Sequence, residues 1–325
     1  MTPILEVKGL KKYFGVSRQE GFRTIRETVH AVDGIDLTVL PGETVGLVGE
    51  SGCGKSTAAR AILRLTEPTS GSVLLQGVDL LALKGEALRQ ARREIGAVFQ
   101  DPFAALDPRM LIGDIVAEPL LVHGLVKNKE EAWVKSRELL NTVGLNPDFV
   151  SRYPHEFSGG QRQRIGIARA IATDPKLIVL DEPISALDLS IRAQILNLLA
   201  ELQSKRGLSY LFIAHDLSVV RHICDRVEVM YLGVIVEEGG TDEVFANPKH
   251  PYTKALLAAV PVANPGAVKR AMPLEGDVPS PVSIPSGCRF RTRCPIAEPA
   301  CASEIPLLKS IATKHRVACR LVETD

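Results

Sequence analysis

The stretch "GLVGESGCGKST" at residues 46–57 decides the fold. It places Gly49, Gly54, Lys55 and Ser56 in the spacing G-x-x-x-x-G-K-S, with an apolar run before it and a helical pattern, "AARAILRL", after it. Such a strand–turn–helix order is typical of a phosphate-binding loop, because the glycines let backbone N–H groups converge at a helix N-terminus. A glycine-rich turn with a chance lysine would not need both flanking elements.

The loop predicts a nucleotide and a magnesium ion as its ligands. Lys55 is expected to reach the β- and γ-phosphates, and the Ser56 hydroxyl is expected to hold Mg²⁺. The loop residues expected to contact ATP are Gly49, Glu50, Ser51, Gly52, Cys53, Gly54, Lys55, Ser56 and Thr57.

Composition limits the class of protein. The chain has 325 residues, a net charge of +1 and 45% hydrophobic residues, enough for one large or two modest domains. Near-neutral charge gives no reason to expect nucleic acid as a partner. The first residues lack the pattern of a signal peptide, and no apolar run approaches the roughly 18–20 residues of a membrane helix. We therefore expect a cytoplasmic chain whose membrane contact is peripheral.

Strand-like and helical patterns alternate along the chain. The runs "KLIVLDEP" at 176–183 and "SYLFIAHD" at 209–216 are separated by the helical "SIRAQILNLLAELQSKRG". This alternation predicts an α/β core with a parallel sheet, interrupted by a helical insertion from about residue 101. "RVEVMYLGVIVEEGG" predicts two strands around Gly233. Beyond about residue 250 a loop-rich extension is expected, because prolines recur at 251, 261, 265, 273, 279, 281 and 285.

Polar residues follow three strands of this core. Asp181 and Glu182 end one strand, where ligands bind in open α/β sheets, so Asp181 is expected to bind Mg²⁺ and Glu182 to orient the attacking water. Adjacent carboxylates on a loop are more often solvated surface, but the apolar strand before them favours function. His215 follows "FIA" and is expected to sense the γ-phosphate. Gln100 follows "IGAVF" and is expected to meet both Mg²⁺ and the water.

A second glycine-rich stretch, "FSGGQRQR" at 157–164, has no lysine. Ser158, Gly159 and Gly160 offer a hydroxyl, backbone N–H groups and a helix N-terminus, which together suit a phosphate. The stretch also reads as a plain helix cap, and the two interpretations are compatible, since a cap would aim the amide groups outward.

The elements "GESGCGKST", "FQDP", "FSGGQ", "LIVLDEP" with "SALD", and "IAHD" stand in this order. The set resembles the nucleotide-binding subunit of ABC transporters across roughly residues 4–250. The resemblance implies a P-loop NTPase fold: a RecA-like core, an antiparallel β subdomain and a helical subdomain at about 101–170.

The resemblance also implies roles for residues outside the loop. In that family "SGGQ" binds the γ-phosphate held by the other subunit. Phe14, rather than Tyr13, matches the aromatic residue that stacks on adenine. We interpret the segment 15–30, which is longer than a minimal loop, as an exposed insertion of unknown role. The residues implied to contact the partner's ATP are Ser158, Gly159, Gly160, Gln161 and Asp188.

The tail resembles a more specific group. "NPKHPYTKALLAAVP" and "LEGDVPSPVSIPSGCRFRTRCPIAEPAC" are similar to the C-terminal extension, here 251–325, of oligopeptide and dipeptide permease ATP-binding subunits of the F type. The resemblance implies an importer with a second, D-type ATP-binding subunit, two transmembrane permease subunits and an extracytoplasmic solute-binding protein. The chain would lie at the cytoplasmic face of the inner membrane. Nickel or glutathione are alternative substrates, and an exporter subunit or an ABC ATPase unconnected with transport are alternative functions.

The tail also holds four cysteines, Cys288, Cys294, Cys301 and Cys319. Four thiolates suit either tetrahedral zinc or a [4Fe–4S] cluster, and the spacing matches no standard pattern of either. The family resemblance implies the [4Fe–4S] cluster, with Zn²⁺ or unligated thiols as the alternatives. We expect such a centre to staple the extension, which is poor in apolar residues.

Overall fold

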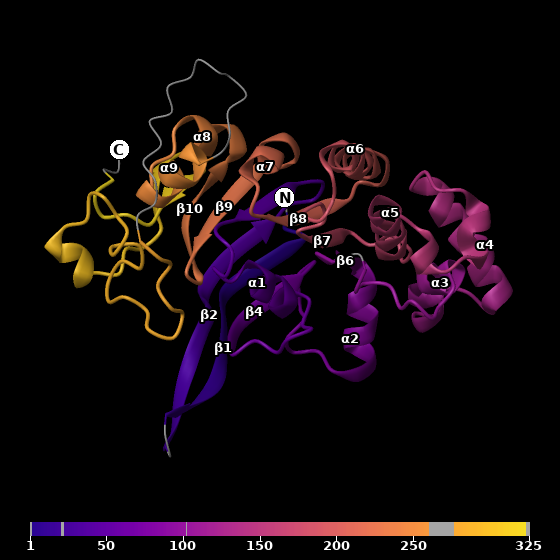
Figure 1. Ribbon diagram of the computed structural model, residues 1–325, viewed down its shortest axis with the longest axis horizontal. Helices are drawn as coiled ribbons and strands as arrows, with labels where there is room; N and C mark the ends of the chain where they lie inside the picture. Colours follow the sequence, from indigo (N-terminus) through magenta and orange to yellow (C-terminus); the bar gives the residue numbers. More distant parts are fainter. Residues whose placement is uncertain (1, 21–22, 102, 260–275, 323–325) are drawn as a thin grey trace. The chain divides into compact units, whose positions relative to one another are not determined.

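The computed structural model describes residues 2–20, 23–101, 103–259 and 276–322 (Figure 1). The chain forms two compact units. Unit 1 comprises Met1–Leu5, Thr38–Glu43 and Leu74–Ile213, and unit 2 comprises Glu6–Leu37, Thr44–Val73 and Ala214–Asp325. Three of the prolines noted in the tail, at positions 261, 265 and 273, and Pro102 of "FQDP" lie outside the described residues.

Unit 1 contains a parallel sheet in the order β8–β7–β6. The strands are β6 (Ile95–Val98), β7 (Leu177–Asp181) and β8 (Ser209–Ala214), with Leu177 opposite both Ile95 and Ser209. Every residue of β7 and β8 is buried, which explains why these strands read as continuous apolar runs rather than as alternating ones. The predicted parallel α/β core is confirmed.

The helices of unit 1 include the predicted insertion. They are α2 (Gly85–Ala91), α3 (Ile112–Val122), α4 (Lys129–Thr142), α5 (Gly159–Ala170) and α6 (Leu189–Arg206), with short 3-10 turns at Arg92–Glu94, Pro147–Ser151 and Pro154–Glu156. Helix α5 packs on α3 and α4, and also on β6 and α6 (Figure 1). It therefore joins the helical insertion to the parallel strands, and its N-terminus carries "SGGQ".

Unit 2 contains a mixed sheet in the order β11–β12–β10–β9–β3. Its strands are β3 (Thr44–Val48), β9 (Arg226–Tyr231), β10 (Val234–Gly240), β11 (Lys309–Ala312) and β12 (His315–Val317). β3 and β9 are parallel, whereas β9 and β10 are antiparallel and turn at Gly233, as predicted. β12 pairs with β10, so the end of the tail extends this sheet.

Four α-helices accompany that sheet in the described part of unit 2. They are α1 (Lys55–Ile62), α7 (Leu217–Ile223), α8 (Thr241–Ala246) and α9 (Pro251–Ala258), and a 3-10 turn spans Pro299–Ala302. Helix α1 begins at the lysine of the predicted phosphate loop, directly after β3 and the glycine-rich turn. The strand–turn–helix order inferred from the sequence is thus present.

A long antiparallel hairpin precedes the loop. Strands β1 (Leu5–Glu20) and β2 (Arg23–Val39) form it, and β4 (Ser70–Leu75), which pairs with β5 (Val78–Asp79), extends it in the order β2–β1–β4–β5. Of the segment 15–30, interpreted as an insertion, residues 15–20 lie in β1 and residues 23–30 lie in β2 (Figure 1).

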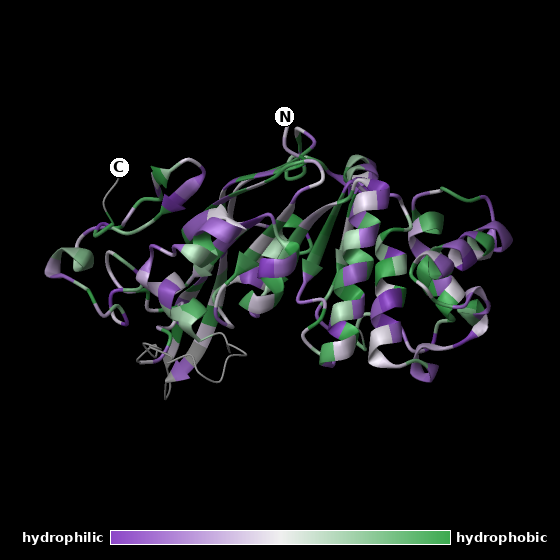
Figure 2. Cartoon of the chain, turned by 90° about the horizontal axis from the view of Figure 1, so that it is seen from above, coloured by the Kyte–Doolittle hydropathy of each residue, from purple (hydrophilic) through white to green (hydrophobic). Residues whose placement is uncertain are grey.

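Hydrophobic and hydrophilic residues alternate along the helices, as expected for elements with one buried face (Figure 2). Among the described residues, no helix has the length and apolar character that crossing a bilayer requires.

Candidate nucleotide site

Two glycines of the predicted phosphate loop, Gly49 and Gly54, lie where other backbone segments approach closely. A Cβ atom at Gly54, whose φ is +112°, would lie 2.1 Å from the carbonyl oxygen of Ala31. A Cβ atom at Gly49 would lie 2.2 Å from the carbonyl oxygen of Met230. Only glycine satisfies both positions without moving the backbone. Gly54 is also the N-cap of α1 and no side chain caps that helix, so the amides of its first turn suit an anionic ligand.

Lys55 is folded over its own loop. Its side chain is buried, and Nζ donates hydrogen bonds to the carbonyl oxygens of Gly49 (2.8 Å) and Glu50 (3.0 Å). The Cys53 thiol lies 3.8 Å from Nζ, and burial raises the pKa of that thiol, which keeps it neutral beside the ammonium. Phosphate groups bind to hydrogen-bond donors and positive charge, and the loop provides both: the uncapped amides at the N-terminus of α1 and the Lys55 ammonium. The residues of the loop therefore fit ATP.

Glu50 is held by two side chains that our sequence analysis did not identify. The Glu50 backbone N–H donates to the Tyr252 hydroxyl at 2.8 Å. The Glu50 carboxylate accepts a bidentate pair of hydrogen bonds from Arg293, at 2.6 and 3.1 Å. These partners lie 202 and 243 residues further along the chain, and no local pattern marks them. Their position in the extension, within "HPYT" and "RTRCP", was the one available signal.

Glu182 and Gln100, both predicted to act on the attacking water, meet in unit 1. The Gln100 amide donates to the Glu182 carboxylate at 2.8 Å, across 82 residues of sequence. Glu182 has φ +48°, a conformation that costs energy for a residue with a side chain and that is common at functional sites. Its backbone N–H is fixed by the carbonyl oxygen of Ile213 in β8. Asp181 ends β7 and is 3% exposed, so its carboxylate is an oxygen ligand in a largely dry setting, suited to Mg²⁺.

The "SGGQ" stretch forms the N-terminus of α5, as predicted. The Ser158 hydroxyl accepts from the Gln161 backbone N–H, and the Gln161 side chain accepts from the Ser158 backbone N–H at 3.0 Å, a reciprocal capping box. Ser158 is exposed. The helix-cap interpretation is therefore confirmed, and the contact with a partner's phosphate stays a prediction.

Gly160 connects this cap to the next helix. A Cβ atom at Gly160 would lie 2.5 Å from the Ile191 side chain in the first turn of α6. Asp188 caps that same turn by accepting from the Ile191 backbone N–H, and this hydrogen bond lowers the pKa of the Asp188 carboxyl. "SGGQ" and "SALD", separate motifs in the sequence, thus belong to two helix N-termini in contact.

The predicted roles of two further residues, His215 toward the γ-phosphate and Phe14 toward adenine, stay predictions. His215 directly follows β8 and is exposed. Phe14 lies on β1, half exposed, with the Lys12 ammonium 4.7 Å from its ring centroid. Its neighbour Tyr13 is engaged elsewhere, since its hydroxyl donates to Asp33 and its ring lies 4.3 Å from that of His30. This leaves Phe14 as the less committed of the two aromatic rings.

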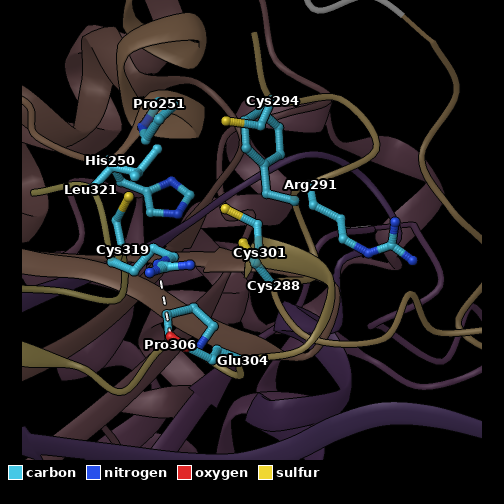
Figure 3. Close-up of a pocket in the computed structure, with 12 residues that line it drawn as sticks. His250, Pro251, Cys288, Arg291, Cys294, Cys301, Glu304, Pro306, Cys319 and Leu321 are labelled. Atoms are coloured by element: carbon cyan, nitrogen blue, oxygen red, sulfur yellow. Dashed lines mark ion pairs between the residues drawn. The ribbon is translucent and has the colours of Figure 1, made fainter. Parts of the chain in front are cut away.

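The prediction of a [4Fe–4S] cluster is wrong. The four tail cysteines line one pocket together with His250 (Figure 3). However, no group of three or more His, Cys, Asp or Glu side chains in the described residues is placed to hold a metal ion. Burial also raises the pKa of Cys288 and Cys294, which favours the thiol over the thiolate that metals bind. The same findings give the zinc alternative no support.

The described part of the tail is held by packing and hydrogen bonds instead. Phe290 is 1% exposed and packs against Tyr231 and Tyr252, with ring centroids 5.2 and 5.4 Å apart. Arg289 binds the Asp33 carboxylate, and its guanidinium also donates to the carbonyl oxygen of Leu232. Through Phe290 the extension thus packs against Tyr231 of β9, and this aromatic cluster provides apolar contacts that the extension is otherwise poor in.

Two family models match the chain. The model described as "ABC transporter" matches residues 32–185, which include the loop, "SGGQ" and the carboxylates. The model described as "Oligopeptide/dipeptide transporter, C-terminal region" matches residues 236–301, which include Tyr252 and Arg293. Solved structures agree with the fold. The ATP-binding cassette MJ0796, a dimer bound to ADP and Pi, aligns with a TM-score of 0.61 at 30% identity, covering 73% of this chain and 98% of that one.

Curated proteins match over nearly the whole length. The oligopeptide transport ATP-binding protein AppF of Bacillus subtilis is 54% identical, over 98% of this chain and 97% of that protein. The oligopeptide transport ATP-binding protein OppF of Salmonella typhimurium is 52% identical, over 98% and 96%. The chain has the P-loop NTPase fold and hydrolyses ATP, with Mg²⁺ as the expected companion ion. With both family models in their expected order and such identity over its whole length, the chain belongs to the ATP-binding subunits of ABC-type oligopeptide transporters.

Proposed function

We propose that this chain is the ATP-hydrolysing subunit that drives the import of peptides through an ABC transporter. The supporting observation is the similarity to oligopeptide transport ATP-binding proteins over 98% of the chain, tail included. The tail favours this function over an exporter subunit or an ATPase unconnected with transport, because it matches the C-terminal region of peptide transporters. Partners of this chain are then permease subunits and a solute-binding protein, and the chain associates peripherally with the membrane through them.

In the chemical step, the loop amides and Lys55 neutralise the phosphate charge. Ser56 and Asp181 are the residues that would hold Mg²⁺ when it is bound. Glu182 accepts a hydrogen bond from the attacking water and orients it, and Gln100 fixes the Glu182 carboxylate by the 2.8 Å hydrogen bond. The metal ion, when bound, spreads the charge that develops on the transferred phosphoryl group.

The "SGGQ" segment acts on the ATP of a second subunit, which we propose to be of the D type. Three features support this. Ser158 is exposed, the segment caps its own helix through the Ser158–Gln161 capping box, and the solved cassette MJ0796 is a dimer. A donor cluster brought in by the partner stabilises phosphate charge as an arginine finger does. Closure of two subunits around two ATP molecules would then be passed to the permease.

Uptake by the reconstituted complex tests the proposal. The chain, its D-type partner and both permease subunits are placed in vesicles with ATP inside and the solute-binding protein outside. We expect labelled oligopeptide to accumulate with ATP and not with Lys55→Ala. Export of peptide, or ATP hydrolysis without any peptide uptake, would favour the two alternative functions, and selective uptake of nickel or glutathione would change the substrate class.

A further inference from the structure

Two residues of the C-terminal extension bind Glu50 of the phosphate loop. Tyr252 accepts the Glu50 backbone N–H at 2.8 Å, and Arg293 binds both carboxylate oxygens at 2.6 and 3.1 Å. Glu50 lies between Gly49 and Ser51, in the middle of the residues expected to surround the phosphates. One loop position is therefore fixed in both its backbone and its side chain by residues more than 200 positions away.

Both partners of Glu50 are themselves rigidly placed. Tyr252 lies in the first turn of α9, is fully buried, and packs against Tyr231 and Phe290 with ring centroids 4.7 and 5.4 Å apart. The Arg293 side chain is 5% exposed, and its backbone N–H donates to the carbonyl oxygen of Phe290 at 3.0 Å. Tyr252 belongs to this aromatic cluster, and Arg293 is tied to Phe290 of the cluster through its backbone, so both fix Glu50 with little entropic cost of ordering mobile side chains.

Glu50 passes this placement on to the loop. Its carbonyl oxygen accepts from the Lys55 ammonium at 3.0 Å and from the Cys53 backbone N–H at 3.3 Å. A displacement of Glu50 therefore moves the lysine and a neighbouring amide together. The lysine ammonium and the loop amides stabilise phosphate charge only when each donor lies within hydrogen-bond distance of the phosphate, so a small displacement weakens nucleotide binding.

Charge gives the contact a second effect. A carboxylate in the middle of a phosphate loop repels an anionic ligand, because like charges a few ångströms apart are unfavourable in a partly dry site. The bidentate guanidinium of Arg293 compensates the Glu50 charge, and the pair is only partly open to solvent, with side-chain exposures of 5% and 26%. The Glu50 carboxylate in turn raises the pKa of the Arg293 guanidinium, so this residue stays charged.

From these contacts we infer that Arg293 and Tyr252 are positioning residues for ATP: they hold Glu50, and through it Lys55, and Arg293 cancels a charge that would repel the phosphates. The extension thereby sets the affinity of the phosphate loop for nucleotide, in addition to any contact it makes with other subunits. This inference rests on the proposed assignment of residues 49–57 to ATP.

Equilibrium binding of a fluorescent ATP analogue with Mg²⁺ to the purified full chain tests the inference. We expect Arg293→Met to weaken binding about tenfold, within the usual range of coupling between two sites. The sharper test is the double variant Glu50→Gln with Arg293→Met. If charge compensation is a part of the effect, removing the carboxylate restores most of the lost affinity, whereas a purely structural role of Arg293 predicts no restoration.

Controls separate this inference from the function on which it rests. Arg291→Met is matched in type and segment, but the hydrogen bonds of the Arg291 side chain within the described residues go to Ser286 of the tail, so this variant should bind ATP as the wild type does. Lys55→Ala should abolish binding; if it binds normally, the assignment of the loop to ATP fails. If Lys55→Ala loses binding while Arg293→Met keeps wild-type affinity, the inference about the extension is wrong.

A second variant covers the case in which Arg293→Met does not fold. Tyr252→Phe keeps the aromatic ring in its cluster and removes only the hydroxyl that accepts the Glu50 N–H. We expect about fivefold weaker ATP binding, at the low end of the range for such coupling, with a normal circular dichroism spectrum. Wild-type affinity in this variant would contradict the role of Tyr252.

Discussion

The phosphate loop and the "SGGQ" segment are both glycine-containing helix N-termini, but they are built in opposite ways. The loop is held by other segments: Gly49 and Gly54 lie against β9 and β2, and Glu50 is bound by the extension. The "SGGQ" segment is held from within by its own capping box, and Ser158 is exposed. A rigid cradle suits a ligand bound by this chain, whereas an exposed, self-sufficient cap suits a ligand brought by another. The difference supports the proposed division between the chain's own ATP and the partner's.

Glu182→Gln should give the largest effect and test the catalytic half of the comparison. The substitution keeps the hydrogen bond to Gln100 possible but removes the base, so we expect hydrolysis by the assembled complex to fall by about 10²–10⁴-fold. ATP binding should be retained, because Glu182 is outside the loop. Single-turnover hydrolysis and nucleotide binding measure the two effects, and near-normal turnover would remove Glu182 from its proposed role.

Ser158→Arg should separate the two helix N-termini. The isolated chain should bind ATP normally, since the segment is exposed and self-capped, whereas turnover of the assembled complex should drop by about 10²–10³-fold, the usual cost of losing a donor to a developing charge. Binding by the isolated chain and ATPase activity of the complex are measured on the same preparation. The proposed difference between the two helix N-termini is wrong if turnover of the complex stays unchanged, or if the isolated chain also loses ATP binding.

Gly54→Ala and Gly159→Ala compare the two segments as structures. At Gly54 the new Cβ would meet the Ala31 carbonyl oxygen at 2.1 Å with φ at +112°, and we expect a loss of about 2–4 kcal/mol in the free energy of unfolding. At Gly159 the nearest atom, of Leu187, is 3.6 Å away, so we expect a change within about 0.5 kcal/mol. Urea unfolding of both variants gives the values. Equal losses would show that the loop is not the more tightly constrained segment.

Glu228→Gln should give the smallest effect, on the strand beside β3. Burial raises the pKa of the Glu228 carboxyl from 4.5 to about 8, against the opposing charge of Arg226. A raised pKa means that the neutral form is favoured on folding, so this group's contribution is present below about pH 4.5 and is lost as pH rises through about 8. Glutamine cannot ionise, and the variant should therefore lose less thermal stability than the wild type between pH 5 and pH 9. An unchanged pH dependence of Tm would exclude Glu228 as its source.

The extension shows where sequence reasoning failed. Four cysteines in one segment favoured a metal centre. Spacing alone, however, does not show whether the thiols converge on one point or are held separately as buried thiols, and this is why the prediction failed. In the structure, Phe290, Arg289 and Arg293 attach the described part of the tail to strands and loops of unit 2, and the cysteines line a pocket without forming a metal-binding group. Aromatic packing between distant segments leaves no periodic mark in the sequence, and so it was not predicted.

The sequence by itself determined the local elements of this protein. "GESGCGKST", "FSGGQ" and "LIVLDEP" each predicted an element and its chemistry, because a strand, a glycine turn and a helix cap depend on neighbouring residues and on backbone conformation. Tertiary structure alone decided which distant groups meet: Gln100 with Glu182, Gly160 with Ile191, and Glu50 with Tyr252 and Arg293. These contacts join positions up to 243 residues apart, and their geometry is set by the packing of whole elements, which no local pattern encodes.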